Sequence, residues 1–200
     1  MMQDRYRTIG SATQAVLREK ASRFIAFAFP ITDQEDFKRR VDAIAKEHHS
    51  SRHVCYAWVL GDNGDQQRSN DAGEPNGTAG KPILNRILGA NLTYTAVVVV
   101  RYFGGTLLGK SGLIKAYGEA AQMALDEAPI EERMVRGKIA ITCTHAKFEA
   151  IKRELIAMEG EVVKSGFTSV VDAVLAVPKS KVEECVDRWA ARGIQARADQ

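Results

Sequence analysis

A glycine-rich segment that follows a hydrophobic run is the first pattern in this sequence with chemical meaning. The segment Gly104-x-x-x-x-Gly109-Lys110-Ser111 matches the phosphate-loop expression G-x4-G-K-[ST], and it comes after the β-branched run Thr95–Val100. Beyond it, apolar residues recur at helical spacing, so the pattern predicts a buried strand, a glycine turn and a helix. Such an arrangement directs free backbone N–H groups and the positive end of a helix dipole toward the turn. The sequence therefore predicts an anion-binding turn.

Nucleotide hydrolysis fits this segment less well than the binding of a simple phosphate group. Leu107 and Leu108 are bulky at the point where a phosphate loop curls around its ligand. No later strand is expected to end in an aspartate that would hold magnesium, because Asp172 lies inside its run. The remaining chain also offers too few strands for a phosphate-loop core. We therefore favour phosphate binding without hydrolysis.

A second polar segment, Asn70–Pro82, contains three glycines, two prolines, two carboxylates and a lysine. This composition is typical of a shaped, functional loop. The alternative interpretation is a turn-rich connection that leads into a helix, with Thr78 as its cap and Pro82 in its first turn. Lys81 is followed by proline rather than Ser or Thr, which excludes a second phosphate loop. Both interpretations of the segment stay open.

Two short pairs, His53-x-Cys55 and Cys143-x-His145, could each supply two metal ligands. Neither pair has the C-x-x-C spacing of a zinc motif, so buried cysteines and hydrogen-bonded histidines are the favoured interpretation, and we expect no metal and no cofactor. No G-x-S-x-G nucleophile motif is present. A dyad of Cys55 with His53 is a weak candidate for nucleophilic catalysis.

Composition places the chain among globular proteins with substantial cores. It has 200 residues, 45% hydrophobic content and a formal net charge of +3, with basic and acidic residues spread over both halves. This balance permits a local nucleic-acid-binding patch but does not require one. The first ten residues lack the apolar stretch of a signal peptide, and no run approaches the ~18 apolar residues of a membrane helix. With three widely spaced cysteines, we expect a cytoplasmic protein with no membrane partner.

The first part of the chain is predicted to alternate strands with helices. Extended structure is expected over residues 6–31, with breaks at Gly10-Ser11 and at Lys20-Ala21. Thr32 or Asp33 is the expected N-cap of a helix that ends near Glu47. The remaining expected elements are a strand over residues 54–60, a long polar loop over 61–82, a helix over 82–88, and the strand and helix of the glycine-rich segment.

The rest of the chain is predicted to form a second domain. Residues 127–137 contain Pro129 and a run of charges, which indicates a linker. The pattern that follows predicts elements at residues 138–142, 147–158, 160–164, 168–177, 180–191 and 194–198, with Ser180 as the cap of the last helix. Their order, βαββαβ, is that of a ferredoxin-like sandwich.

Six motifs are distributed along the sequence: Lys20-Ala-Ser-Arg-Phe-Ile25, Arg52-His-Val-Cys-Tyr-Ala57, Asp71–Pro82, Val97–Gly105, Leu108-Gly-Lys-Ser-Gly-Leu113 and Ala116-Tyr117. With these motifs the sequence closely resembles, over almost its whole length, the YigZ/IMPACT family of uncharacterised conserved proteins. The family pattern has a second aspartate where this chain has Ala72, and often Gly-Gly where it has Ser111-Gly112. The absence of that carboxylate argues against metal chemistry at the loop.

The resemblance implies an α+β protein of two domains. The first, residues 1–130, is expected to share the fold of the second domain of ribosomal protein S5. The second, residues 136–200, is expected to be ferredoxin-like and similar to a domain of elongation factor G. Eukaryotic IMPACT proteins bind a ribosome-associated activator and restrain an initiation-factor kinase. They carry an extra N-terminal interaction domain that we do not expect here, so that partner is not transferred to this chain.

Two hypotheses of function follow. The first is a non-enzymatic module that binds RNA or ribosomes and modulates translation or its stress response, with a protein partner as a further candidate. Its phosphate- or RNA-binding residues would be Lys81, Arg101, Gly104, Gly105, Gly109, Lys110 and Lys115. Its loop-shaping residues would be Asp71, Glu74, Gly77, Thr78 and Gly80. The alternative is an enzyme or small-ligand binder for an anionic substrate between the two glycine-rich loops, with His53 or Glu74 as acid or base.

Overall fold

The structure is a computed structural model that describes residues 4–199 and divides into two compact units. One unit comprises Tyr6–Arg133, and the other comprises residues 134–199 together with residues 4–5. Each unit has its own hydrophobic core. The protein is therefore of mixed α/β composition, as the sequence predicts.

A five-stranded antiparallel sheet forms the centre of the first unit. Its strands follow the order β2 (Thr13–Glu19), β3 (Ser22–Pro30), β6 (Thr95–Tyr102), β4 (His53–Leu60) and β5 (Gln66–Asn70). All neighbouring strands run antiparallel. The breaks predicted at Gly10-Ser11 and Lys20-Ala21 separate β1 (Arg5–Ile9), β2 and β3.

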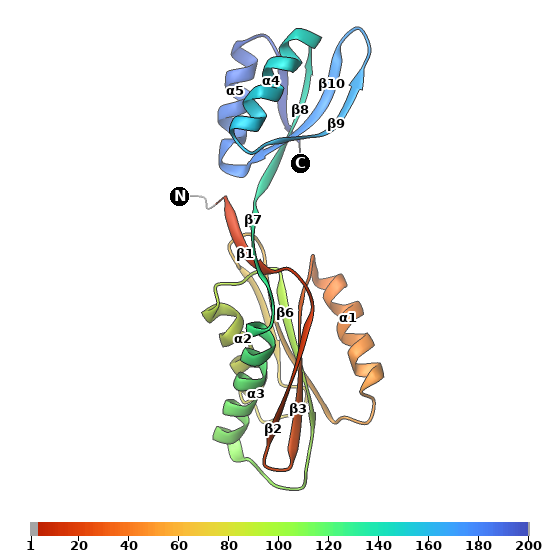
Figure 1. Ribbon diagram of the computed structural model, residues 1–200, viewed down its shortest axis with the longest axis vertical. Coiled ribbons are helices and arrows are strands. Elements are labelled where there is room, and N and C mark those ends of the chain that lie inside the picture. Colours follow the sequence, from red (N-terminus) through yellow and green to blue (C-terminus); the bar gives the residue numbers. More distant parts are fainter. Residues whose placement is uncertain (1–3, 200) are drawn as a thin grey trace. The chain divides into compact units, whose positions relative to one another are not determined.

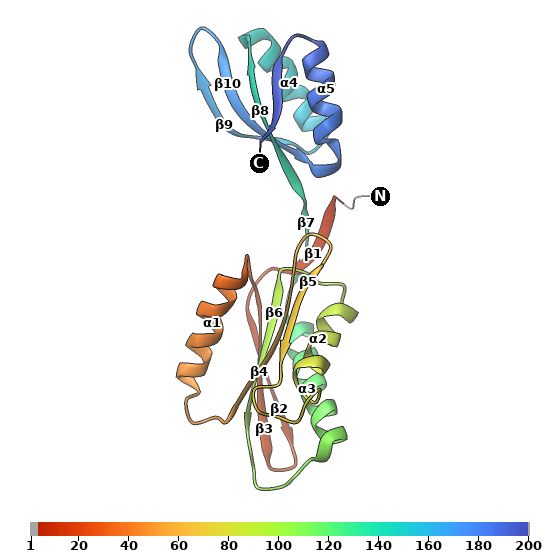
Figure 2. The same cartoon turned by 180° about the vertical axis from the view of Figure 1, so that it is seen from behind.

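Helices cover both faces of this sheet. The helix α1 (Gln34–Glu47) lies on one face, and α2 (Gly80–Gly89) and α3 (Gly109–Asp126) lie together on the other (Figure 1, Figure 2). The central strand β6 therefore needs apolar side chains on both sides, which its β-branched run supplies. Val97 and Val99 join the core beneath α2 and α3, whereas Val98 joins the core beneath α1. The prediction of a strand buried on both faces is confirmed.

The start of α1 also agrees with the sequence prediction. Asp33 occupies the N-cap position, and its carboxylate accepts the backbone N–H of Asp36. Of the two predicted caps, Asp33 is therefore the one used, which satisfies one of the unpaired N–H groups of the first turn.

Two segments predicted as irregular form strands. The edge strand β5 lies inside the predicted polar loop and is exposed along its whole length, so its residues show no alternation that could reveal it. The predicted linker contains β7 (Ile130–Met134), which pairs with β1 in a two-stranded sheet. Backbone pairing compensates for the scarcity of buried side chains in both segments.

The second unit has the predicted element order βαββαβ. Its elements are β8 (Arg136–Cys143), α4 (His145–Ala157), β9 (Glu161–Phe167), β10 (Val171–Pro178), α5 (Val182–Ala191) and β11 (Gln195–Asp199). The strands form an antiparallel sheet in the order β11-β8-β10-β9. Both helices lie on one face of the sheet (Figure 1), where Phe148, Leu175 and Trp189 are buried.

The predicted capping of the last helix by Ser180 is wrong. Ser180 lies in the short 3₁₀ helix η1 (Lys179–Lys181), and α5 begins two residues later without a side-chain cap. The backbone N–H and the hydroxyl of Ser180 both donate to the carboxylate of Asp4 instead. A partner far away in sequence, Asp4, therefore binds this hydroxyl in place of the helix N-terminus.

In the described part of the chain, no helix is long and apolar enough to cross a membrane.

Gly104 is required by a close approach of two backbones. A Cβ atom added at Gly104 would lie 1.8 Å from the carbonyl oxygen of Ala21, in the turn between β2 and β3. That contact is with backbone and cannot be relieved by a side-chain rotation. The glycine therefore permits the end of β6 to pass beside the β2–β3 turn.

We expect Gly104→Ala to lower the free energy of unfolding of the first unit by about 1–3 kcal/mol, because the added methyl group forces the backbone apart. Gly89→Ala is the matched control, since a Cβ atom there meets no atom within 4 Å. Urea denaturation curves compare the two variants. Equal unfolding midpoints would contradict the close approach.

Candidate functional site

The two glycine-rich loops of the first unit border one cavity. The cavity has a volume of about 430 Å³ and lies between the start of β4, the loop before α2, the end of β6 and the start of α3. Its lining residues are Arg52, His53, Glu74, Pro75, Arg101, Phe103, Leu107, Leu108, Gly109, Lys110 and Leu113. Segments separated by about thirty residues in the sequence thus contribute to the same cavity.

A buried ion pair joins the first loop to the central strand at this cavity. Arg101 Nη1 lies 2.7 Å from Glu74 Oε1, and the two side chains are 6% and 4% exposed. The hydroxyl of Tyr117, on α3, donates to the same carboxylate oxygen at 2.8 Å. Arg101 also donates to the Ser22 hydroxyl from Nη2, at 3.4 Å. The Glu74 carboxylate therefore connects the loop, β6 and α3.

Asp71 organises the backbone of the first loop. Its carboxylate accepts the N–H groups of Gly77, Ala79 and Gly80 at 2.8–2.9 Å. Partial burial raises the pKa of this carboxyl, but the three backbone hydrogen bonds outweigh it and hold the pKa below its usual value. Two of the three donors, Ala79 and Gly80, lie at the start of α2. The Asp71 side chain therefore caps the N-terminus of this helix, although Asp71 itself lies in the preceding loop.

The interpretation of Thr78 as the helix cap is therefore wrong. The helix α2 begins at Gly80 with Ala79 at the N-cap position and no side-chain cap from that residue. The hydroxyl of Thr78 donates to the carbonyl oxygen of Pro75 at 2.6 Å, within the loop. Pro82 lies in the first turn, where its missing N–H costs nothing.

The Cys55 thiol is not an activated nucleophile. It is fully buried, and its proton lies within reach of the Asp71 carbonyl oxygen at 3.0 Å and the Tyr117 hydroxyl oxygen at 3.4 Å. Burial raises the pKa of Cys55 to about 12, and burial likewise raises the pKa of Tyr117. A thiol with this pKa holds its proton at neutral pH, which removes the Cys55–His53 dyad as a nucleophilic centre.

His53 has one ring nitrogen engaged. Its Nδ1 lies 2.9 Å from the carbonyl oxygen of Ala72, and a carbonyl can only accept, so Nδ1 carries a proton. In the tautomer that carries only this proton, Nε2 is the acceptor of the ring.

The backbone of Ala72 has φ of 45°, in the left-handed region that aspartate tolerates better than alanine. This preference gives a backbone reason for the aspartate of the family pattern.

The predicted phosphate-binding residues fall into two groups. Lys81, Lys110 and Lys115 are exposed, whereas Arg101 is buried in its ion pair. Gly105 and Gly109 have φ of 89° and 71°, a conformation for which glycine is favoured. The helix α3 begins at Gly109 without a side-chain cap or an acidic residue in its first turn. Its N-terminal N–H groups and dipole therefore face the glycine turn as predicted.

Several residues at the cavity were not singled out by sequence reasoning. These are Arg52, Pro75, Phe103 and Leu113. Phe103 is 48% exposed and Leu107 is 81% exposed, which is unusual for two large apolar side chains in one short loop. Both residues lie in the turn that follows the buried strand β6, and this position was the signal in the sequence that could have drawn attention to them. The exposure of their side chains, however, cannot be recognised in the sequence.

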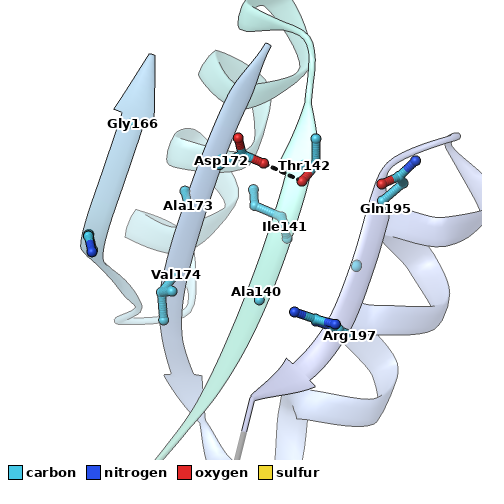
Figure 3. A pocket seen from close by; sticks show the side chains of 11 residues that line it. Ala140, Ile141, Thr142, Gly166, Asp172, Ala173, Val174, Gln195 and Arg197 are labelled. Carbon is cyan, nitrogen blue, oxygen red and sulfur yellow. Dashed lines mark hydrogen bonds between the residues drawn. The ribbon is translucent and has the colours of Figure 1, made fainter. Parts of the chain in front are cut away.

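A second cavity, of about 660 Å³, lies on the sheet of the other unit, on the face that carries no helix. Figure 3 shows Asp172 directed at Thr142, to which it is hydrogen-bonded, and Arg197 extending from β11 toward β8. Lys164 of β9 also lines this cavity. The lining also includes alanine, glycine, isoleucine and valine residues, and its charged residues are of both signs. Among residues 4–199, no cluster of His, Cys, Asp and Glu could hold a metal ion.

Fold and site together define a two-unit α/β protein with a cavity between two glycine-rich loops of its first unit. Residues 20–125 match the family described as the Impact N-terminal domain. The "IMPACT family member YigZ" of Escherichia coli (strain K12) is 36% identical over 179 residues, which cover 88% of each chain. An "IMPACT family member" of Haemophilus influenzae is 34% identical over 166 residues, covering 82% of this chain and 81% of that one.

A solved structure described as "Crystal structure of an hypothetical protein" is similar over the whole length. Its sequence is 32% identical, its TM-score is 0.73, and the match covers 100% of this chain and 99% of that chain. The chain belongs to the IMPACT family, which confirms the resemblance seen in its motifs.

We expect Asp71→Asn to lower the free energy of unfolding by about 2–3 kcal/mol at neutral pH, because hydrogen bonds to a charged acceptor are lost. The folded-state pKa of Asp71 is depressed, so this stabilisation is present above the unfolded pKa of about 4 and disappears as pH falls through the folded value. Urea denaturation at a series of pH values measures the difference from wild type. Asp42→Asn, on the exposed side of α1, is the control and should be close to neutral.

We expect Arg101→Met to destabilise the first unit by about 3–5 kcal/mol, because Glu74 is left as an unpaired buried charge. Adding Glu74→Gln should recover part of this loss in a double-mutant cycle. Arg23→Met, at an exposed arginine stacked on Tyr102, should cost no more than about 1 kcal/mol. Additive effects of the Arg101 and Glu74 substitutions would contradict the coupling.

Proposed function

We propose that this protein is a non-enzymatic module that binds RNA or the ribosome and acts in translation or its stress response. The observation that carries the proposal is that the two glycine-rich loops and the helices that follow them carry exposed cations and an exposed aromatic ring. Arg52 and Lys110 line the cavity, Lys81 and Lys115 are exposed on the adjoining helices, and Phe103 lines the cavity and is 48% exposed.

These groups suit RNA for two physical reasons. Lysine and arginine side chains bind phosphate oxygens whatever the sequence, and the uncapped start of α3 adds backbone N–H donors. An exposed phenylalanine offers a flat apolar face on which an unpaired base can stack. Arg101 is excluded from the proposed phosphate contacts, since it is buried and paired with Glu74.

The same geometry disfavours catalysis at the two candidate residues. Glu74 Oε1 already accepts hydrogen bonds from Arg101 and Tyr117, which leaves it poorly suited to remove a proton from a substrate. His53 is held at Nδ1 by the Ala72 carbonyl, and the thiol of Cys55 two residues along β4 is buried, with its pKa raised to about 12. A binding role would use the exposed cations and Phe103, whereas an enzymatic role would need Glu74 or Cys55, whose side chains are buried.

Fold and family support the translational context of the proposal. The order βαββαβ with the sheet order β11-β8-β10-β9 supports a ferredoxin-like second domain, and we propose the S5 domain 2-like fold for the first. IMPACT proteins of eukaryotes act on a ribosome-associated activator, and membership of this family is the basis for transferring the general context. Three buried free cysteines support a reducing, cytoplasmic location.

Co-sedimentation with ribosomes at about 50 mM and about 300 mM salt tests the proposal. We expect pelleting of the wild type to fall steeply with salt, because phosphate contacts release counterions. The variant Lys81→Ala/Lys110→Ala/Lys115→Ala should bind more weakly, with a salt slope reduced by about 2.

The matched control is Lys38→Ala/Arg39→Ala/Lys46→Ala, which removes three exposed cations from α1 on the opposite sheet face. It should pellet as the wild type does. No pelleting of the wild type at low salt, or equal losses in both variants, would reject the proposal.

A further inference from the structure

The cavity between the two loops is more apolar than a surface for a nucleic-acid backbone requires. Its apolar lining residues are Pro75, Phe103, Leu107, Leu108 and Leu113. A volume of about 430 Å³ falls within the range typical of small-molecule sites, which combine an apolar lining with a few convergent polar groups. Phosphodiester contacts use exposed cations and gain nothing from a cavity of this kind.

The polar groups at the cavity favour an anion. Arg52, Arg101 and Lys110 line it together with a single lining carboxylate, Glu74, whose Oε1 is already bound by Arg101 and Tyr117. Gly109 and Lys110 also form the uncapped N-terminus of an 18-residue helix, so backbone N–H groups and a positive dipole end are added at the same place. The ligand that complements these charges is negative.

A buried donor without a partner provides an independent observation. Among residues 4–199, the Nε atom of Arg101 has no hydrogen-bond partner, although it is buried in a side chain that is only 6% exposed. The two Nη atoms of Arg101 are bound to Glu74 and Ser22. Buried donors are almost always satisfied in folded proteins. Because Arg101 lines the cavity, an acceptor on a bound ligand is the natural partner for this N–H group.

We propose that this cavity binds a small organic anion with an apolar body, such as an aromatic or branched aliphatic carboxylate or phosphate. The anionic group lies at Lys110 and the first turn of α3. The apolar body packs against Phe103, Leu108 and Leu113. This inference goes beyond the proposed function, because it concerns a small ligand inside the cavity and holds whether or not the surrounding surface binds RNA.

Fluorescence titration of the full-length protein with anilinonaphthalene sulfonate, an apolar anion, tests the inference. We expect saturable binding at one site per chain, with an emission shift to shorter wavelength. Lys110→Ala should weaken the affinity about five- to tenfold, because an opposing charge is removed from a partly desolvated site. Phe103→Ala should weaken it by a similar factor through lost apolar contact.

The control variant is Lys164→Ala, which removes a lysine from the cavity on the sheet of the second unit. It should leave the affinity unchanged, and the uncharged parent, anilinonaphthalene, should bind the wild type less tightly than the sulfonate. Unaltered thermal unfolding of Lys110→Ala and Phe103→Ala, both at exposed positions, shows that the variants are folded.

Three results would overturn the inference. The first is binding that Lys164→Ala weakens as much as Lys110→Ala, and the second is equal affinity for the charged and uncharged probes. The third is complete displacement of the probe by one equivalent of single-stranded RNA, which would assign the cavity to RNA. A probe that binds as expected to a protein that fails to pellet with ribosomes would reject the proposed function alone.

Discussion

The ion pair between Glu74 and Arg101 is the interaction on which the arrangement of the site depends. It joins the loop before α2 to the end of the central strand, and Tyr117 extends the connection to α3. A buried ion pair is a weak source of net stability, because desolvation of both charges offsets their attraction. Its partners are nevertheless strongly constrained, since separating them leaves a charge buried and unpaired. The main effect of the pair is therefore to fix how the two glycine-rich loops meet, and its net contribution to the stability of the domain is small.

This constraint divides the polar groups of the site into two sets. Asp71 and Glu74 are engaged within the structure by backbone N–H groups, Arg101 and Tyr117, and Arg101 is bound through its two Nη atoms to Glu74 and Ser22. Lys110, with the uncapped start of α3, remains available to solvent and ligands. The groups that remain available are cationic and apolar. They are the basis of both proposals, RNA binding outside the cavity and the binding of a small anion within it.

The elements that the sequence predicted correctly are those with a strong local signal. The run Thr95–Val100 indicated a strand buried on both faces, and the pair Thr32 and Asp33 indicated the start of α1. The errors concern residues whose role depends on a distant partner. The edge strand β5 has five exposed residues and is visible only through its pairing with β4, and Ser180 bonds to Asp4 rather than capping α5. The local pattern of residues indicates which side chains are buried and where the chain turns. Pairing between distant segments produces no hydrophobic periodicity, so it cannot be recognised in the sequence.

The amino-acid sequence by itself determined the family, the order of the elements in the second unit and the glycine turn that presents the N-terminus of α3. Only the tertiary structure decided which charged residues are free. In the sequence Arg101 and Lys110 are two basic residues on either side of the same glycine-rich turn, yet Arg101 is 5% exposed and Lys110 is exposed. The difference arises because Glu74, 27 residues away, is brought against Arg101 when the loop closes on β6. Electrostatic pairing depends on distance in space, and that distance exists only in the folded chain.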